Sequence, residues 1–264
     1  MTIVLALALA LAALALTLLL RRIVEQRARI AALGADLERL QQACSTLAPS
    51  GVMERVFAEG ADTLAERKVV TAMFVDLFGY TALSETLDPQ ALARVLNGYF
   101  ERVSDAITRH RGRVNTFLGD GVLSFFGALE PNPWQCDDAV HAALAIRTAM
   151  AEYRAELERE GLPSLKVGIG IHRDTGLAGL IGSRERREYT VIGRTVNLAA
   201  RLQALTREHD VDILVTDAVR QTLDPRFEVR ALPPQTIKGI AEPVQTYAVI
   251  GLRAGAPVSQ GAQG

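Results

Sequence analysis

The chain has 264 residues, of which 49% are hydrophobic and 22% are charged, and its formal net charge is −1. This length suits one large domain, or one domain with an extension. A net charge so close to zero excludes a general electrostatic attraction to nucleic acid, and we expect no nucleic-acid partner. The two cysteines, Cys44 and Cys136, form no motif with each other or with a histidine, which favours a reducing compartment.

An unbroken apolar run, TIVLALALALAALALTLLL, occupies residues 2–20 and is followed at once by Arg21 and Arg22. About 20 apolar residues, rising about 1.5 Å each, span a hydrocarbon core of about 30 Å. A cleaved signal peptide is the alternative, but its basic residues would precede the apolar run. The positive-inside rule therefore predicts a single-pass transmembrane helix over residues 1–20 in the inner (plasma) membrane, with the bulk of the chain in the cytoplasm.

Residues 21–48 repeat an apolar residue every seven positions, in two registers that lie three residues apart. The registers are Ile23, Ile30, Leu37 and Cys44, and Leu33, Leu40 and Leu47. Apolar positions at this spacing predict a short parallel coiled coil and therefore a dimer. A single amphipathic helix lying on its own domain is the alternative. Pro49 and Gly51 end the helical pattern, and residues 49–65 are predicted to be a linker.

From Glu66 onward the pattern is that of a folded domain. The run KVVTAMFVDLFG (68–79) is rich in β-forming residues and too apolar for an edge strand. A helix is predicted to follow from Asp88, its N-cap, to Gly112. The apolar face of this helix comprises Leu92, Val95, Leu96, Tyr99, Val103 and Ile107.

The next stretch, NTFLGDGVLSFFG (115–127), predicts two strands joined by a Gly-Asp-Gly turn. A second long helix is predicted at about 136–159, then the strands LKVGIGIH and YTVIG, the helix TVNLAARLQALTREH and further strands. The order β-α-β-β-α-β with additions predicts an α+β, ferredoxin-like fold over residues 66–251, with helices on one face of an antiparallel sheet and additional C-terminal strands. Residues 252–264 contain too few apolar residues to fold and are predicted to be a disordered tail.

Two aspartates lie where strands end. Asp76 closes the run TAMFVD, and Asp120 lies at the tip of the hairpin. The first strand and the hairpin lie side by side in such a sheet, so both carboxylates can approach one point. This is costly unless a cation neutralises them, and Mg²⁺ or Mn²⁺ prefers such oxygen ligands. The backbone N–H groups of LFGYTAL, after Asp76, suit a phosphate, so the segment indicates a two-metal site for a triphosphate. A strand-end aspartate and an unrelated turn aspartate remain the structural alternative.

Four blocks in the chain carry a resemblance to a known family: FVDLFGYTALSE, FLGDGVLSFFG, YTVIGRTVNLAARL and TIKGIAEPVQTY. In this order and spacing they resemble the catalytic domain of class III nucleotidyl (adenylyl/guanylyl) cyclases, as in membrane-anchored bacterial adenylate cyclases. The match runs from about Glu66 to Gly251. The resemblance implies a homodimer with active sites at its interface. It also implies conversion of ATP to 3′,5′-cyclic AMP and pyrophosphate, which makes the protein a phosphorus–oxygen lyase.

The resemblance also implies roles for individual residues. Asp76 and Asp120 match the aspartates that bind two metal ions, and the phosphate loop corresponds to Phe78, Gly79, Tyr80 and Thr81. Asn197 and Arg201, contributed by the other chain, match the pair that orients the ribose and stabilises the transition state. They are four residues apart and so share one face of a helix. Lys238 matches a lysine that contacts the terminal phosphates. A further phosphate-binding arginine is expected before YTVIG; Arg184 is our choice, with Arg186 and Arg187 as alternatives.

Two positions govern the choice of base in the family. Adenylyl cyclases mostly have a lysine four residues before the second metal aspartate and an aspartate or threonine seven residues before the asparagine; here these are Thr116 and Thr190. Thr190 suits one adenylyl subgroup, whereas the hydroxyl of Thr116 is shorter than a lysine and can reach a base through water. The glutamate and cysteine usual in guanylyl cyclases occur at neither position. We expect ATP as substrate, with reduced rate or specificity. A weak or inactive nucleotide-binding or dimerisation module is the alternative.

Overall fold

The computed structural model describes residues 21–23, 25–30, 34, 65–183, 187–238 and 240–253. The chain divides into two units, Met1–Met53 and Glu54–Gly264, and each is described by itself. In the first unit the described residues are helical, as the heptad pattern predicts for that segment. Among the described residues no helix is long and apolar enough to cross a membrane. The predicted transmembrane helix at 1–20, most of the coiled coil and nearly all of the linker lie outside the described residues and stay predictions.

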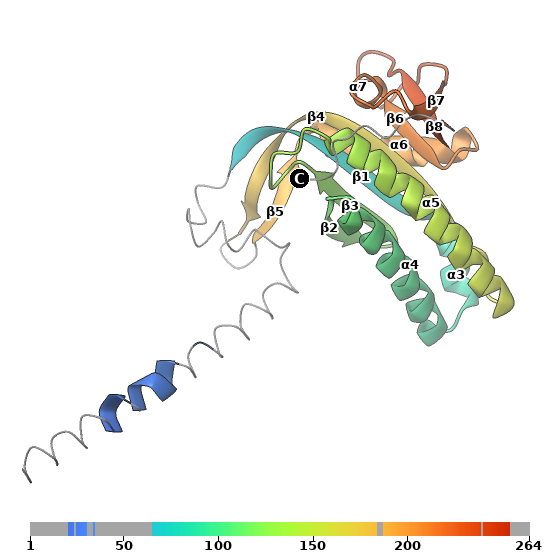
Figure 1. Ribbon diagram of the computed structural model, residues 1–264. Coiled ribbons are helices and arrows are strands. Elements are labelled where there is room, and N and C mark those ends of the chain that lie inside the picture. The colour runs from blue at the N-terminus through green and yellow to red at the C-terminus, as the bar shows by residue number, and fades with distance from the viewer. Residues whose placement is uncertain are drawn as a thin grey trace, which may run out of the picture. The chain divides into compact units, whose positions relative to one another are not determined.

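The second unit is built on one mixed sheet (Figure 1). Its strands are β1 (Glu66–Phe78), β2 (Arg113–Leu118), β3 (Gly121–Phe126), β4 (Lys166–Gly182), β5 (Arg187–Ile192), β6 (Ile213–Thr216), β7 (Phe227–Ala231) and β8 (Thr246–Leu252). Its helices are α3 (Tyr80–Thr86), α4 (Pro89–Arg109), α5 (Gln135–Arg159), α6 (Arg194–Glu208) and α7 (Asp217–Arg220). The strand β8 reaches Leu252, one residue into the predicted tail.

The strand order is β2-β3-β1-β4-β6-β8-β7, with β5 paired to β4. The first four strands in this order, together with α4 and α5, form the predicted β-α-β-β-α-β unit, and their pairings are antiparallel. The additional strand β6 pairs parallel with β4, and β8 and β7 continue the sheet. The ferredoxin-like core with additional C-terminal strands is therefore present.

Local sequence signals account for the position of α4. The side chain of Asp88 accepts hydrogen bonds from the backbone N–H groups of Gln90 (3.0 Å) and Ala91 (3.1 Å), as an N-cap does. At the other end, the N–H of Gly112 donates to the carbonyl of Ile107 (2.9 Å). The helix between these points lays its apolar stripe on the sheet and holds Tyr99 in a fixed position.

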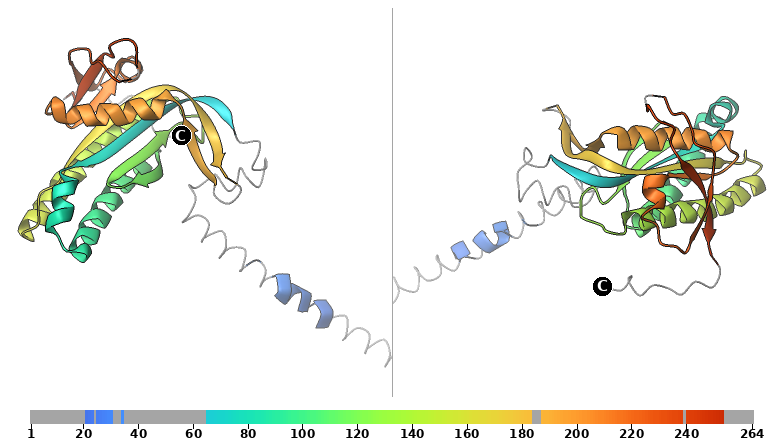
Figure 2. Two further views of the ribbon diagram at one scale, coloured as in Figure 1. Left: turned by 180° about the vertical axis from the view of Figure 1, so that it is seen from behind. Right: turned by 90° about the horizontal axis from the view of Figure 1, so that it is seen from above.

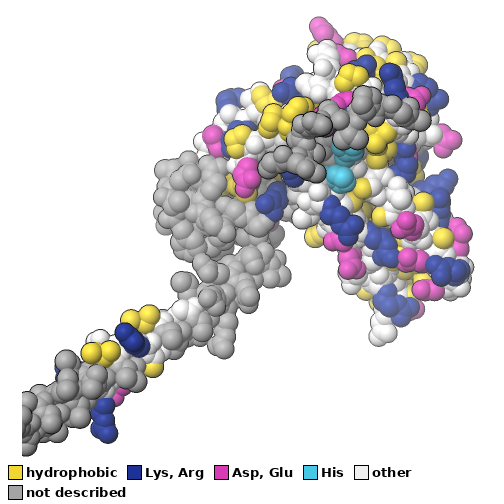
Figure 3. All heavy atoms as spheres, viewed as in Figure 1, with side chains coloured by type: hydrophobic (Ala, Val, Ile, Leu, Met, Phe, Trp, Pro, Cys, Tyr) yellow, Lys and Arg dark blue, Asp and Glu magenta, His cyan; other side chains and the backbone are white. Residues whose placement is uncertain are grey.

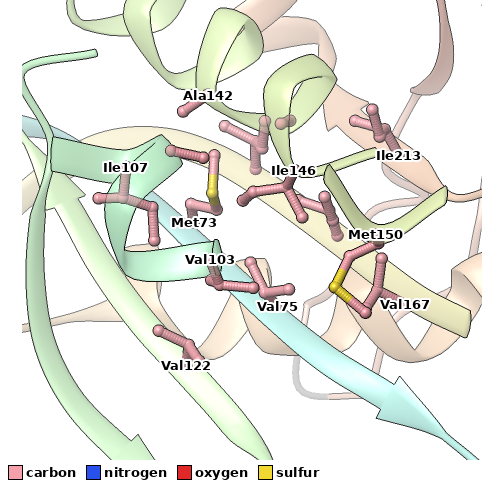
Figure 4. Close-up of a cluster of buried hydrophobic side chains, with 14 of the residues drawn as sticks. Met73, Val75, Val103, Ile107, Val122, Ala142, Ile146, Met150, Val167 and Ile213 are labelled. Carbon is pink, nitrogen blue, oxygen red and sulfur yellow. The ribbon is translucent and has the colours of Figure 1, made fainter. Parts of the chain in front are cut away.

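The main core lies between the sheet and the two helices α4 and α5 (Figure 4). The strand β1 contributes Met73 and Val75 to it, α4 contributes Val103, and α5 contributes Ile146 and Met150. All of these side chains are buried. This layer fixes the end of β1, where Asp76 lies, against α4.

The prediction that helices lie on one face of the sheet holds for α4 and α5 but is wrong for α6. Figure 2 shows α6 and α5 on opposite sides of the strands. Side chains alternate between the two faces of β4, and Gly168 and Gly170 lie on the side of α6. A Cβ at Gly168 would clash with Thr206, and one at Gly170 with the backbone of Ala199. The missing side chains let α6 approach the strand closely.

Candidate active site

The sheet brings Asp76 and Asp120 together. In the pairing of β1 with β3, Val75 lies opposite Val122, so the next residue of β1, Asp76, lies at the tip of the β2–β3 hairpin. A loop of two residues joins the hairpin strands, since Leu118 pairs with Gly121. In this loop Gly119 has a φ of 67°, which favours glycine, and Asp120 follows it. The convergence expected from the strand order is therefore present.

The two carboxyl groups lie close enough for their side chains to share a hydrogen bond. Burial, followed by the charge of Asp120 and this hydrogen bond, raises the pKa of Asp76 from its usual 3.8 to about 6. A backbone hydrogen bond at Leu77 and the positive charge of Arg207 act in the opposite direction. Without a cation, holding both groups ionised is therefore unfavourable, and a bound cation would remove that cost.

The hydroxyl of Tyr99 lies in the core between α4 and the sheet, and the sequence analysis placed the residue only in an apolar stripe. Tyr99 is 0% exposed, and its hydroxyl has no hydrogen-bond partner. Burial raises its pKa well above the usual value, and the charges of Asp76 and Asp120 raise it further. Leaving a buried hydroxyl unpaired costs about 1–3 kcal/mol. A hydroxyl in an otherwise aliphatic stripe was the signal that could have singled it out.

These donors fit a hard divalent cation. Two carboxylates meet at one point, and a bound cation would remove the cost of ionising both. In the part of the chain that the structure describes, His, Cys, Asp and Glu side chains form no group of three or more that could hold a metal ion. A cation at Asp76 and Asp120 would thus take its remaining ligands from backbone, water or substrate, as Mg²⁺ does beside phosphates.

The predicted phosphate loop follows directly. Phe78 ends β1, and Gly79, with a φ of 79°, leads into α3 at Tyr80; the side chain of Thr81 is outside the described part. A Cβ at Gly79 would meet no atom within 4 Å, so space is open beside the loop. A groove of about 760 Å³ adjoins Phe78 and Gly79, and its basic lining residues are Arg147, Arg154, Lys166 and Arg207. The groove is also lined by Asp210 and Asp212, and Arg147 is paired with Asp212, so its charge is mixed.

Arg207 is a second residue that the sequence analysis missed. Its guanidinium lies 4.9 Å from the centre of the Phe78 ring, and its charge lowers the pKa of Asp76. Arg207 lies in the C-terminal turn of α6. This turn lies beside the part of β1 that carries Asp76 and Phe78. Only the position of α6 on the sheet reveals this proximity, because the sequence separation is large.

Asn197 and Arg201 belong to a different surface of the same helix. The buried residues of α6 are Thr195, Leu198, Ala199, Leu202, Gln203 and Thr206. Asn197 is exposed and Arg201 half-buried, on the side of the helix away from the sheet. Asn197 also lies ten residues before Arg207, which is about 15 Å along a helix. Asn197 therefore lies about three helical turns from the end of α6 that reaches Asp76, and Arg201 about two turns.

Lys238 lies with this second group. It is an exposed turn residue next to Ile237, which packs in one cluster with Leu198 and Leu202 of α6. This contact places Lys238 beside the helix that carries Asn197 and Arg201. The predicted site residues thus form two sets, one at the end of β1 and one around the outer side of α6.

The residues expected to read the base occupy two strands. Thr116 is half-buried on β2, where it pairs with Leu123 after a bulge, and Thr190 is half-buried on β5 opposite Gly179. The strands β3, β1 and β4 separate β2 from β5 in the sheet order, so strand pairing does not bring the two threonines together. Arg184 and its alternative Arg186 lie outside the described residues, and Arg187 begins β5.

Residues 64–251 match the model of the adenylate and guanylate cyclase catalytic domain. The chain belongs to this family. Adenylate cyclase 1 of Rhizobium meliloti is 29% identical to this chain over 85% of its length, and the adenylate cyclase of Anabaena cylindrica is 32% identical over 78% of it. The matches cover 35% and 40% of those two proteins, so this chain spans well under half the length of either relative.

Solved structures share the fold but do not distinguish an adenylyl from a guanylyl cyclase. The adenylyl cyclase CyaB from P. aeruginosa superposes with a TM-score of 0.68 at 30% identity, covering 73% of this protein and 99% of that chain. The guanylyl cyclase Cya2 superposes with a TM-score of 0.66 at 31% identity, covering 73% and 97%. Since the two are equally similar, the choice of base has to be argued from individual side chains.

Proposed function

We propose that this cyclase converts ATP to 3′,5′-cyclic AMP and pyrophosphate in a site formed by two copies of the chain. The observation that carries the proposal is the meeting of Asp76 and Asp120 at the end of β1, where burial and mutual repulsion raise the pKa of Asp76. Two carboxylates held together at such a cost are best explained by a divalent cation. The adenylate cyclases among the relatives favour a purine nucleotide triphosphate as the ligand beside it.

Asp76 and Asp120 would hold Mg²⁺ or Mn²⁺, two ions per site, which when bound polarise the α-phosphate and acidify the ribose 3′-hydroxyl. The open side of Gly79 leaves room for phosphate oxygens beside Phe78 and Tyr80. The ribose 3′-oxygen bonds to the α-phosphorus, the bond from that phosphorus to the bridging oxygen of pyrophosphate breaks, and the hydroxyl proton passes to solvent. The chemistry needs positioning and charge stabilisation, and no covalent intermediate.

A homodimer would complete the site. Asn197 and Arg201 project from the side of α6 that faces away from their own sheet, where a second copy can meet them. An asparagine would orient the ribose, and an arginine would neutralise charge on the α-phosphoryl oxygens. Lys238 lies beside them and would contact the terminal phosphates. Two copies related by a twofold axis would form two equivalent sites.

A direct assay tests this function. The full chain in detergent is incubated with Mg²⁺ or Mn²⁺ and with ATP or GTP, and cyclic nucleotides are separated and quantified. We expect cyclic AMP from ATP at a rate far above that of Asp76→Ala. If neither triphosphate gives more cyclic nucleotide than this variant, the chain is no cyclase. ATP binding without turnover would instead support the second candidate, a nucleotide-binding or dimerisation module, which Thr116 in place of the usual lysine motivates.

Thr116 provides a test of substrate choice. We expect Thr116→Lys to raise turnover of ATP about tenfold and to leave turnover of GTP unchanged, because a lysine supplies a charged donor to the adenine ring. Initial rates with both nucleotides measure this. Thr108→Lys adds the same charge at an exposed position of α4 and should change neither rate. A gain with GTP equal to that with ATP would place Thr116 away from the base.

The location of the protein is part of the proposal. The apolar run at 2–20 followed by two arginines motivates a single-pass anchor in the inner membrane with the cyclase in the cytoplasm. On the face in Figure 3, basic and acidic side chains of the described residues are interspersed over the second unit, so this face lacks the continuous basic surface that nucleic acid requires. Cell fractionation is expected to recover the chain with membranes, and a variant without residues 1–20 in the soluble fraction. Recovery of both in the soluble fraction would refute the anchor.

A further inference from the structure

We propose that Lys166 and Arg207 form a subsite for the β- and γ-phosphates of the nucleotide, on the same chain that carries Asp76. This inference rests on the proposed function and adds two substrate-binding residues to it. The two side chains would neutralise the negative charge that develops on the leaving pyrophosphate. They would do so from the loop's own chain, whereas Lys238 would approach the same phosphates from the second copy.

The first observation is that Lys166 and Arg207 flank Phe78, where the predicted phosphate loop begins. The guanidinium carbon of Arg207 lies 4.9 Å from the centre of the Phe78 ring, within the range of a cation–π contact. Lys166 pairs with Phe78 in the ladder between β1 and β4, and paired residues project from the same face of a sheet. Both positive charges therefore lie beside the loop whose backbone N–H groups are expected to bind phosphate.

The second observation is that Phe78, between these two cations, shares a face of the sheet with Asp76. The two residues are two apart on β1, so their side chains project to the same side. Asp76 pairs with Gly168, where a Cβ would come within 2.8 Å of the Phe78 ring and would clash with Thr206 of α6. The missing side chain at Gly168 thus brings Phe78 and the last turn of α6 together, next to the candidate metal ligand.

The third observation is that positive charge is in excess around the groove beside the loop. Arg147 is already neutralised, because its Nη2 donates to Asp212 Oδ1 (2.9 Å). The other charged residues of the lining are Arg154, Lys166, Arg207 and Asp210. Within the described part of the chain Lys166 and Arg207 form no ion pair, and both are exposed. Cations without an acidic partner are available for charge-assisted hydrogen bonds to phosphate oxygens.

The fourth observation concerns the arginines before YTVIG, one of which is predicted to bind phosphate. Arg187, the described residue among them, pairs with Gly182 of β4, whereas Asp76 pairs with Gly168. The two positions on β4 are fourteen residues apart, which is about 45 Å along a strand. Arg187 can thus reach the phosphate loop only from a second chain. The two proposed cations belong to the chain that carries the loop.

The test compares Arg207→Gln and Lys166→Gln with the control Arg109→Gln, all in the full chain in detergent. Arg109 is exposed on α4 and lies outside the groove. Calorimetric titration with pyrophosphate in the presence of Mg²⁺ measures the affinity, and melting temperatures are recorded without ligand. We expect each groove variant to weaken pyrophosphate binding about tenfold, because a charge-assisted hydrogen bond to phosphate is lost. All three variants should melt as the wild type does, since the replaced side chains are exposed.

Arg207→Lys is expected to recover part of the lost affinity, because it keeps the charge but not the planar fork of the guanidinium. An unchanged pyrophosphate affinity in Arg207→Gln, or a loss that Arg109→Gln reproduces, would overturn the inference alone. A wild-type chain that does not bind pyrophosphate would overturn it whatever the activity. If the two groove variants lose pyrophosphate but the wild type makes no cyclic nucleotide, the cations bind a polyphosphate without turnover. The proposed cyclase function then fails by itself.

Discussion

Asp76→Asn is expected to lower cyclase activity at least about 100-fold, because a neutral amide offers a hard divalent cation one oxygen and no charge. The measurement is the initial rate of cyclic AMP formation at saturating ATP and Mg²⁺. Asp105→Asn is the matched control, since Asp105 is exposed on α4 and, among the described residues, pairs with its neighbour Arg109 at 3.2 Å. Activity of Asp76→Asn within a few-fold of the control would rule out Asp76 as a metal ligand.

The same substitution is expected to stabilise the protein when metal is removed. The pKa of Asp76 is raised from 3.8 to about 6, so the unfolded chain loses this proton at a lower pH than the folded chain does. Ionisation therefore costs stability increasingly between about pH 4 and 6 and by a constant amount above that. After discounting for solvent screening of a half-buried group, the cost is about 1–2 kcal/mol. In EDTA, Asp76→Asn should resist urea better than the wild type at pH 8 and equally at pH 4.

This pair of effects separates a metal site from a structural aspartate. A structural aspartate would lose stability on replacement, because its hydrogen bonds would be weakened. A carboxylate whose charge lowers stability without metal, and whose loss abolishes turnover, is best explained as a ligand of the cation. Lower stability of Asp76→Asn at pH 8 in EDTA would contradict this account even if activity were lost.

The meeting of the two aspartates could be predicted from sequence because it depends only on strand order. Once β1 and the hairpin are neighbours and Val75 pairs with Val122, Asp76 must lie beside the hairpin tip. The N-cap at Asp88 was likewise predictable, since capping is a local interaction. Features of this kind can be predicted from the residues next to them in the sequence and from the order of the strands and helices.

The residues that sequence reasoning missed depend on contacts between distant segments. Tyr99 lies in the predicted apolar stripe of α4, and only the packed core shows that its hydroxyl is buried without a hydrogen-bond partner among the described residues. Arg207 reaches Phe78 because Gly168 and Gly170 admit α6 to the second face of β4. Alternating glycines in an otherwise aliphatic strand were a visible sign that another element approaches there. Which element it would be could not be known from their spacing.

Mixing two inactive variants is expected to restore activity, which would be the clearest sign that each site uses two chains. Asp76→Ala and Arg201→Ala should each be inactive alone. The first lacks a metal ligand, and the second lacks the positive charge of Arg201. In a mixed dimer one site combines the intact Asp76 of one chain with the intact Arg201 of the other. The second site of that dimer carries both changes.

Each purified mixed dimer contains one intact site of its two, so about half of the wild-type activity per dimer should return. The chains are co-expressed with different affinity tags, and mixed dimers are purified through both tags before the cyclic AMP assay. A variant with both substitutions on one chain, mixed with wild type, controls for dilution. The position of Asn197 and Arg201 on the outer side of α6 makes this outcome necessary if they act in catalysis. Mixed dimers as inactive as the separate variants would mean that Arg201 and Asp76 do not share a site.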